Sequence, residues 1–241
     1  MQFHLPSGFT QAASPAVMGG GLIEPAYVQS TAGNTNTDSG TLAVSYVTSP
    51  TANNLLIAVV YASEAGTATS VDSLTGFTAI GAGAFSALGG QHMLAFYKVS
   101  TGAESGTTTA TCFYEGTLGR RIAARMFEFS GTKTSGTPYE DLDQATQTTS
   151  TSMTQVPVTT AGAARLVVHC AALALVSTTV SAFTGETGGN LVEPVAEYAP
   201  TGTTISVQTA SMPSAATITG GTATLGLTAE TLKCAFALIP R

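Results

Sequence analysis

The feature that most constrains the fold is an uninterrupted apolar run at residues 55–61 (LLIAVVY), which directly follows the turn-forming sequence SPTANN. A second run, within residues 164–174 (ARLVVHCAALA), lies about 111 residues later and also follows a small-residue turn, TTAGA. Short runs of Leu, Ile and Val bounded by turn signals are typical of strands buried on both faces. The sequence therefore predicts a fold built around two central strands.

The composition indicates the class of this fold. Charged residues make up 9% of the chain, against roughly 25% in an ordinary soluble domain. Solubility therefore rests on uncharged polar groups, and 41 residues are threonine. Threonine is β-branched and favours strands, while its hydroxyl keeps an outer sheet face wet. The sequence predicts an all-β protein.

Alternating patterns support an antiparallel β-sandwich or jelly roll. Residues 41–47 (TLAVSYV) alternate with a period of two, which indicates a half-buried strand. Further short strands are expected up to residue 129 and, after a polar connection at residues 130–152, from residue 153 to residue 240, the last two at residues 222–227 and 233–240. Short strands separated by Gly, Pro and Asn suit such folds.

The chain also contains two similar sequence halves, at about residues 41–130 and 153–241. VTSPTANNLLIAVVYA resembles VTTAGAARLVVHCAALA, GTTTATCFY resembles GGTATLGLT, and ARMFEFSG resembles KCAFALIP. Repeats of this length are too long for a solenoid. We interpret residues 26–241 as one domain made of two half-sandwiches, and two tandem sandwiches are the alternative.

Residues 1–25 differ from the rest of the chain. Pro6, Pro15 and Pro25 and a glycine run at residues 19–21 interrupt apolar residues that follow neither a strand nor a helix period. This segment has too many apolar residues for a purely flexible tail. It predicts an extended arm that attaches to a partner through Phe3, Leu5, Phe9, Val17, Met18, Leu22 and Ile23. A floppy leader is the alternative.

Charge argues against a nucleic-acid partner. The net charge is −6 with 8 basic residues, whereas nucleic-acid binding needs a clustered positive surface. Arg120, Arg121 and Arg125 come nearest to such a cluster. On a strand, however, Arg121 and Arg125 would share a face and Arg120 would point to the other. If Glu128 faced inward it would need a partner, and Arg121 or Arg125 could provide one across a strand pair.

The termini and cysteines predict no export and no membrane partner. The N-terminal sequence has neither the basic start nor the apolar core of a secretory signal, and no stretch approaches the roughly 20 apolar residues of a membrane span. Cys112, Cys170 and Cys234 are odd in number, and each falls within an expected strand, which favours buried free thiols. We expect synthesis in the cytoplasm.

Groups that could carry chemistry are few. PYEDLDQ at residues 138–144 places Glu140, Asp141 and Asp143 in an expected loop, where their carboxylates could bind calcium. Because the spacing lacks the regular calcium-loop pattern, a solvated turn is favoured over a metal site. His169 cannot share a strand face with Cys170, which argues against a joint metal site and indicates a core or interface histidine.

No sequence motif predicts catalysis. No nucleophile elbow, phosphate loop or dinucleotide fingerprint is present. We therefore predict a non-enzymatic protein without cofactor, metal or catalytic residues. An enzyme acting on polysaccharide is a remote alternative, since it would need two carboxylates facing one cleft and no spacing selects such a pair.

The order of several motifs resembles a known group of proteins. NNLLIAVVYA, GFTAI, HMLAFYKVSTGAESGTTTATCF, FEFSGTKTSGTPYE and a final FALIPR occur in that order. This is similar to tailed-phage and prophage accessory virion proteins with a jelly-roll-like domain, such as head fibres, decoration proteins and tail-associated fibres. The likeness covers roughly residues 41–240, and FYKVSTGAESGTTTAT is its most specific part.

The resemblance implies a structural role in the phage particle, after synthesis in the bacterial cytoplasm. We expect an accessory head protein, either a capsid decoration protein or a head fibre or spike, that binds the major capsid protein or vertex and tail proteins through its N-terminal arm. Such proteins form symmetric oligomers, so a homotrimer or homodimer is expected. The alternative is a module of a tail fibre or baseplate that binds a receptor or a host-surface glycan.

Overall fold

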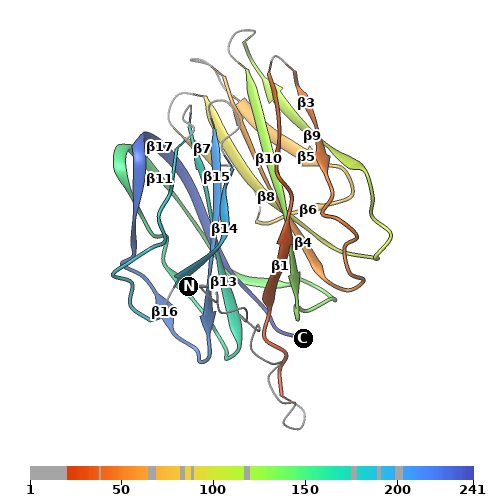
Figure 1. Ribbon diagram of the computed structural model, residues 1–241, viewed down its shortest axis with the longest axis vertical. Helices are drawn as coiled ribbons and strands as arrows, with labels where there is room; N and C mark the ends of the chain where they lie inside the picture. Colours follow the sequence, from red (N-terminus) through yellow and green to blue (C-terminus); the bar gives the residue numbers. More distant parts are fainter. Residues whose placement is uncertain are drawn as a thin grey trace, which may run out of the picture.

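The chain folds into stacked antiparallel β-sheets, seen here in a computed structural model (Figure 1). The structure describes residues 21–37, 39–64, 69–81, 85–87, 90–116, 120–174, 178–188, 191–198 and 203–241. Within these residues every regular element is a strand. The all-β class and the β-sandwich character predicted from the sequence are therefore confirmed.

The strands of the first half of the chain are β1 (Ala26–Ser30), β2 (Asn34–Thr37), β3 (Thr41–Ser45), β4 (Leu55–Ser63), β5 (Thr69–Leu74), β6 (Thr78–Ala79), β7 (Phe85–Ala87), β8 (Gln91–Val99), β9 (Thr107–Tyr114) and β10 (Arg121–Ser130). Those of the second half are β11 (Tyr139–Thr154), β12 (Val158–Thr159), β13 (Arg165–Leu173), β14 (Leu191–Tyr198), β15 (Thr204–Met212), β16 (Thr217–Ile218) and β17 (Thr222–Leu238).

Two large sheets lie face to face at the centre of the molecule (Figure 1). One has the order β1-β10-β4-β8-β6, with β2 also pairing with β10 and β7 with β8, and the other has the order β11-β17-β13-β15-β14. A smaller sheet, β3-β9-β5, covers the outer face of the first, and the β12-β16 pair contributes to the outer layer of the second.

The apolar run that dominates the sequence is strand β4, and each of its nine residues is buried, as predicted. Successive side chains of a strand point to opposite faces, so β4 serves two cores. Its odd-numbered residues face the second large sheet, and its even-numbered residues face β3-β9-β5. Full burial of one aliphatic side chain contributes about 1.5–3 kcal/mol, and β4 makes that contribution on both sides of its sheet.

Strand β13 occupies the matching position in the second large sheet, between β17 and β15. Its even-numbered residues Leu166, Val168 and Cys170 join the central core, which they share with residues of β4, β8 and β10. Its odd-numbered residues face a third core beneath the outer layer. The two runs recognised in the sequence therefore face one another across the central core.

Two sequence-based strand assignments are wrong. The expected polar connection at residues 130–152 contains most of β11, an edge strand of 16 residues, so the carboxylates of residues 140–143 lie on a strand rather than in a loop. The strands expected at residues 222–227 and 233–240 are one continuous strand, β17. Strand β11 escaped detection because an edge strand with few buried side chains needs little apolar character.

Residues 21–25 run extended alongside the C-terminus. The Ile23 N–H donates to the carbonyl oxygen of Arg241 at 3.0 Å, and Glu24 contacts Ser211. The side chains of Leu22 and Ile23 are 58% and 52% exposed. The other apolar residues of the predicted arm, Phe3, Leu5, Phe9, Val17 and Met18, lie outside the described residues.

Candidate functional site

A groove of about 430 Å³ opens between two loops that connect strands of the first half of the chain. One wall is the loop after β3, and the other is the loop between β8 and β9, which carries the most specific part of the family-like sequence. The groove is lined by Tyr46, Val47, Thr48, Ser49, Gly102, Ala103, Glu104, Ser105 and Gly106.

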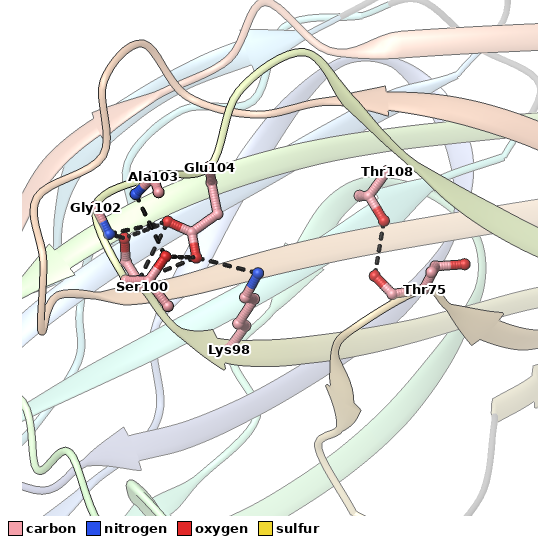
Figure 2. Close-up of polar contacts among 8 residues, drawn as sticks. Thr75, Lys98, Ser100, Gly102, Ala103, Glu104 and Thr108 are labelled. Atoms are coloured by element: carbon pink, nitrogen blue, oxygen red, sulfur yellow. Dashed lines mark hydrogen bonds and ion pairs between the residues drawn. The ribbon is translucent and has the colours of Figure 1, made fainter.

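The β8–β9 loop is organised by one carboxylate, that of Glu104 (Figure 2). Its oxygens accept hydrogen bonds from the Ser100 hydroxyl at 2.8 Å, from the Thr101 N–H and hydroxyl, both at 3.0 Å, and from the Gly102 N–H at 3.1 Å. Lys98 Nζ lies 3.1 Å from Glu104 Oε1. The side chain of Glu104 is only 3% exposed, so these donors replace water around its charge.

These contacts fix the protonation state of Glu104. Burial alone would raise the pKa of this carboxyl, but the hydrogen bonds from Thr101 and Ser100 and the contact with Lys98 outweigh burial and hold the pKa well below its usual range. A carboxylate that stays ionised and already accepts several hydrogen bonds is unsuited to accept a proton from a substrate near neutral pH. Glu104 therefore holds the loop rather than acting as an acid or base.

An aromatic pair lies beside the loop. The rings of Tyr46 and Phe77 stack with their centroids 6.2 Å apart, and Lys98 Nζ lies 5.5 Å and 5.9 Å from the two centroids. A cation at this distance from an aromatic ring is attracted by the ring electrons. Lys98 thus joins the aromatic pair to the Glu104 loop, and Tyr46 gives the groove an aromatic wall.

A second carboxylate, that of Glu128 on β10, holds the opposite loop. Its side chain is fully buried and accepts hydrogen bonds from Asn54 Nδ2 at 2.6 Å, from the Thr51 N–H at 2.8 Å and from Gln29 Nε2 at 2.6 Å. The buried charge is compensated by these donors, as a buried carboxylate requires. The sequence predicted Arg121 or Arg125 as the partner of an inward-facing Glu128, whereas these donors come from Gln29, Thr51 and Asn54.

The two loops are also joined directly. The Asn53 N–H donates to the carbonyl oxygen of Ser100 at 2.9 Å, and the Ser100 N–H donates to that of Asn54 at 2.8 Å. Gly102 packs so closely that an added Cβ would lie 3.1 Å from Ala52 Cβ. Beyond the groove, the Thr108 hydroxyl donates to the carbonyl oxygen of Thr75 at 2.7 Å (Figure 2). The groove is therefore preformed.

The chemistry available in this groove is that of binding. Its lining combines hydroxyl groups, backbone groups, the Tyr46 ring, the apolar side chains of Val47 and Ala103, and a carboxylate committed to its own loop. Preformed concave sites with a few polar groups and an aromatic wall are typical of small-molecule binding. The KVSTGAESG segment belongs to the family-like sequence, but no functional site was predicted there. The available signal was a glutamate following Ser and Thr within four residues, a spacing that favours local side-chain to backbone hydrogen bonds.

The three candidate calcium ligands each make their own local contacts. Glu140 Oε1 lies 2.9 Å from Arg165 Nε and accepts a hydrogen bond from the Ala161 N–H. Asp141 accepts the Thr159 N–H, and Asp143 accepts the N–H of its neighbour Gln144. Across the described residues, no three His, Cys, Asp or Glu side chains are grouped so as to hold a metal ion.

His169 is buried in the third core, where its neutral ring accepts a hydrogen bond. His169 is 1% exposed, and its Nε2 accepts the Val156 N–H at 3.2 Å. Burial, with a smaller effect of the Lys233 charge, lowers the pKa of His169 to about 3. Lys233 itself is 2% exposed, and its Nζ donates to Gln147 Oε1 and to Thr154. Sequence reasoning did not single out this buried lysine.

The arginines considered as a basic patch are engaged in local contacts. Arg120 Nε lies 3.3 Å from Glu64 Oε1, and its guanidinium lies 5.2 Å from the Tyr114 ring. Arg125 Nε donates to the carbonyl oxygen of Thr31 at 2.9 Å. In the part of the chain that the structure describes, no helix is long and apolar enough to cross a membrane.

Comparison with known proteins adds no relative. No protein-family model matches the chain, and the searches of curated proteins and of solved structures found no significant match. The function is therefore inferred from the sequence motifs and from the geometry of the groove.

Proposed function

We propose that this protein is a non-enzymatic structural component of a tailed-phage virion, an accessory head protein of the decoration, fibre or spike type. It attaches to the major capsid protein, or to vertex or tail proteins, through its N-terminal segment and acts as a dimer or trimer. The sequence motifs motivate the proposal. It is also supported by the contacts of three carboxylates, which have structural roles. Glu104 and Glu128 hold loops, and Glu140 pairs with Arg165.

One observation carries the attachment role. Leu22 and Ile23, the last two apolar residues of the expected arm, are more than half exposed although the backbone of Ile23 is bonded to Arg241. Exposed neighbouring apolar side chains on a fixed backbone suit contact with another protein. The proposed arm therefore leaves the domain from a fixed point beside the C-terminus.

The attachment role is tested on particles of the phage or prophage that encodes the protein. We expect the full-length chain to be found on purified particles by electron microscopy with an antibody label. A chain lacking residues 1–20 retains the contacts of Ile23 and Glu24, so it should fold and yet fail to join particles. Undiminished incorporation of the truncated chain would contradict attachment through the arm.

We also propose that the domain is a duplicated unit. The apolar runs occupy the centre of both large sheets, and two exposed apolar residues, Phe113 (56%) and Leu227 (54%), stand at matching positions of the similar sequences GTTTATCFY and GGTATLGLT. A chain cut within the exposed residues 134–137 should then give two fragments that associate through the central core. Fragments that remain unfolded after mixing would oppose this interpretation.

The groove favours a second candidate function, the binding of a host-surface glycan. A sugar presents hydroxyl groups and an apolar ring face, and the groove offers Thr48, Ser49 and Ser105 beside the aromatic ring of Tyr46. Aromatic side chains suit ligands that have one apolar and one polar side. The groove is preformed, which lowers the entropic cost of binding.

A glycan array followed by NMR titration tests this second function. Binding should be lost in Tyr46→Ala and retained in the control Phe113→Ala, which removes an exposed aromatic residue of β9 outside the groove lining. Absence of any binder above background, or equal loss in both variants, would exclude the groove as a glycan site.

A further inference from the structure

Two cysteines face each other in the central core. Cys170 on β13 is directly opposite Cys234 on β17, and both side chains belong to the core between the two large sheets. Directly opposite residues of antiparallel strands have Cα atoms about 4.5–5.5 Å apart, and a disulfide requires about 4.4–6.8 Å. The backbone register therefore already brings this pair within disulfide range.

We propose that Cys170 and Cys234 are a cross-linking site that forms an intramolecular disulfide under oxidising conditions. The co-reactant is a low-molecular-weight disulfide such as oxidised glutathione. One thiolate attacks it to form a mixed disulfide and releases one reduced glutathione, and the second thiolate then displaces the other. In total the two thiols lose two protons and two electrons, which two molecules of reduced glutathione carry away.

The surroundings determine when the bond forms. Both cysteines are at most 1% exposed, and the pKa of Cys170 is raised by its contact with Cys234 and by burial. Buried thiols with raised pKa values react slowly, because the thiolate is the reactive form. The disulfide therefore forms while the chain folds or transiently opens, and the folded core then protects it from reduction.

The bond would join the central strand of the second large sheet to the C-terminal strand. It closes a loop of about 64 residues, and cross-links that close long loops restrict the unfolded chain strongly. A protein made in a reducing cytoplasm and later exposed outside the cell would meet both redox conditions.

The third cysteine supplies an internal control. Cys112 on β9 lies opposite Val71 of β5 and belongs to a different core, the one between β3-β9-β5 and the first large sheet. All three cysteines are described, and only Cys170 and Cys234 are opposite one another in the strand pairings. The proposal therefore specifies one disulfide and one remaining thiol.

The experiment refolds the full-length chain from denaturant in a buffer of oxidised and reduced glutathione. We expect the intact mass to fall by two hydrogen atoms, a peptide map to link Cys170 to Cys234, and one thiol to remain titratable. The Tm should exceed that of the reduced protein by roughly 5–15 °C, because a cross-link that closes a long loop restricts the unfolded chain.

Variants separate this disulfide from other oxidation. Cys112→Ala should still lose two hydrogen atoms on oxidation, whereas Cys170→Ala should lose none. If Cys170→Ala fails to fold, the peptide map of the unsubstituted chain alone shows whether Cys170 is linked to Cys234. Three titratable thiols after refolding, or a bond that includes Cys112, would overturn the proposal.

Discussion

Lys98 Nζ lies 3.1 Å from Glu104 Oε1, at the centre of a loop whose hydroxyl and N–H groups converge on the same carboxylate (Figure 2). Hydrogen bonds to a charged group contribute more than neutral ones, because the electrostatic attraction is larger. One wall of the groove therefore depends on a single ionised side chain.

Replacement of Glu104 by Gln should destabilise this loop. The amide is nearly isosteric, but it has one acceptor oxygen in place of two and no charge for Lys98. We expect the free energy of unfolding to fall by about 1–3 kcal/mol, as measured by urea denaturation. Glu115→Gln, at an exposed position after β9, is the matched control and should change stability by less than about 0.5 kcal/mol. If both substitutions lowered the free energy of unfolding equally, the contacts of Glu104 would not stabilise the loop specifically.

His169 predicts a loss of stability in mild acid. Its folded pKa of about 3 lies below the ordinary 6.5, so on acidification the unfolded chain takes up a proton that the folded chain does not. Stability is full above pH 6.5 and falls as the pH decreases toward 3. Between pH 6.5 and 4.5 we expect a loss of about 2 kcal/mol from this group, in addition to the contribution of carboxylates, which begin to protonate in the lower part of this range.

His169→Gln is the variant that checks this assignment. A glutamine oxygen can accept the Val156 N–H in place of Nε2, and it does not titrate. The variant is expected to show a flatter stability curve between pH 6.5 and 4.5 in urea denaturation, whatever its stability at pH 7. An unchanged slope would assign the acid sensitivity to other groups.

The sequence predicted what depends on short-range pattern. The runs that became β4 and β13 combine apolar side chains with flanking turns, and both features act within a few residues. The pattern predicted burial on both faces of β4, but it could not reveal which sheets Leu55 and Leu56 would face, because that depends on the stacking of sheets. Strand β11 was missed because its stability comes from pairing with β17 rather than from its own burial.

The groove was even less accessible to prediction. Its two walls are about 55 residues apart in the chain, and they meet only because Asn53 and Ser100 pair across the loops. Glu128 could be recognised as a buried charge, but its donors Gln29 and Asn54 lie on separate elements. Contacts between distant segments have no local signature in a single sequence.

Lys233 predicts a gain of stability in mild alkali. Burial lowers its pKa to about 8, from an ordinary 10.5. Between these values the unfolded chain binds a proton that the folded chain has released, so stability from this group rises with pH through that window. The thiols act in the opposite direction, since burial raises the pKa of Cys112 to about 12.

A comparison with Lys233→Met isolates the lysine from the thiols. Methionine fills a similar volume without a charge, and both proteins retain all three cysteines. The stability of the unsubstituted protein relative to this variant should increase from pH 8 to pH 10.5 in urea denaturation. A constant difference over that range would show that Lys233 keeps its proton in the folded state.

Gly131 and Gly106 form a matched pair that tests how residues 21–25 are held. Both have a left-handed backbone, with φ of 69° and 68°. An added Cβ at Gly131 would lie 2.4 Å from the carbonyl oxygen of Glu24, whereas one at Gly106 meets nothing within 4 Å. Alanine at either position incurs the backbone cost of about 1–2 kcal/mol. Gly131→Ala must in addition displace the chain at Glu24, and overpacking of this kind costs about 1–3 kcal/mol more.

The Ile23 N–H is bonded to the carbonyl oxygen of Arg241. Hydrogen exchange at this N–H therefore measures how far each substitution loosens residues 23 and 24. We expect exchange to accelerate at least about tenfold in Gly131→Ala, which corresponds to 1.4 kcal/mol, and to remain unchanged in Gly106→Ala. Urea denaturation should rank the two variants in the same order. If both variants lose the same stability and both protect the Ile23 amide, then residues 23 and 24 do not depend on Gly131. An Ile23 amide that exchanges without protection in the unsubstituted protein would contradict the fixed exit point proposed for the arm.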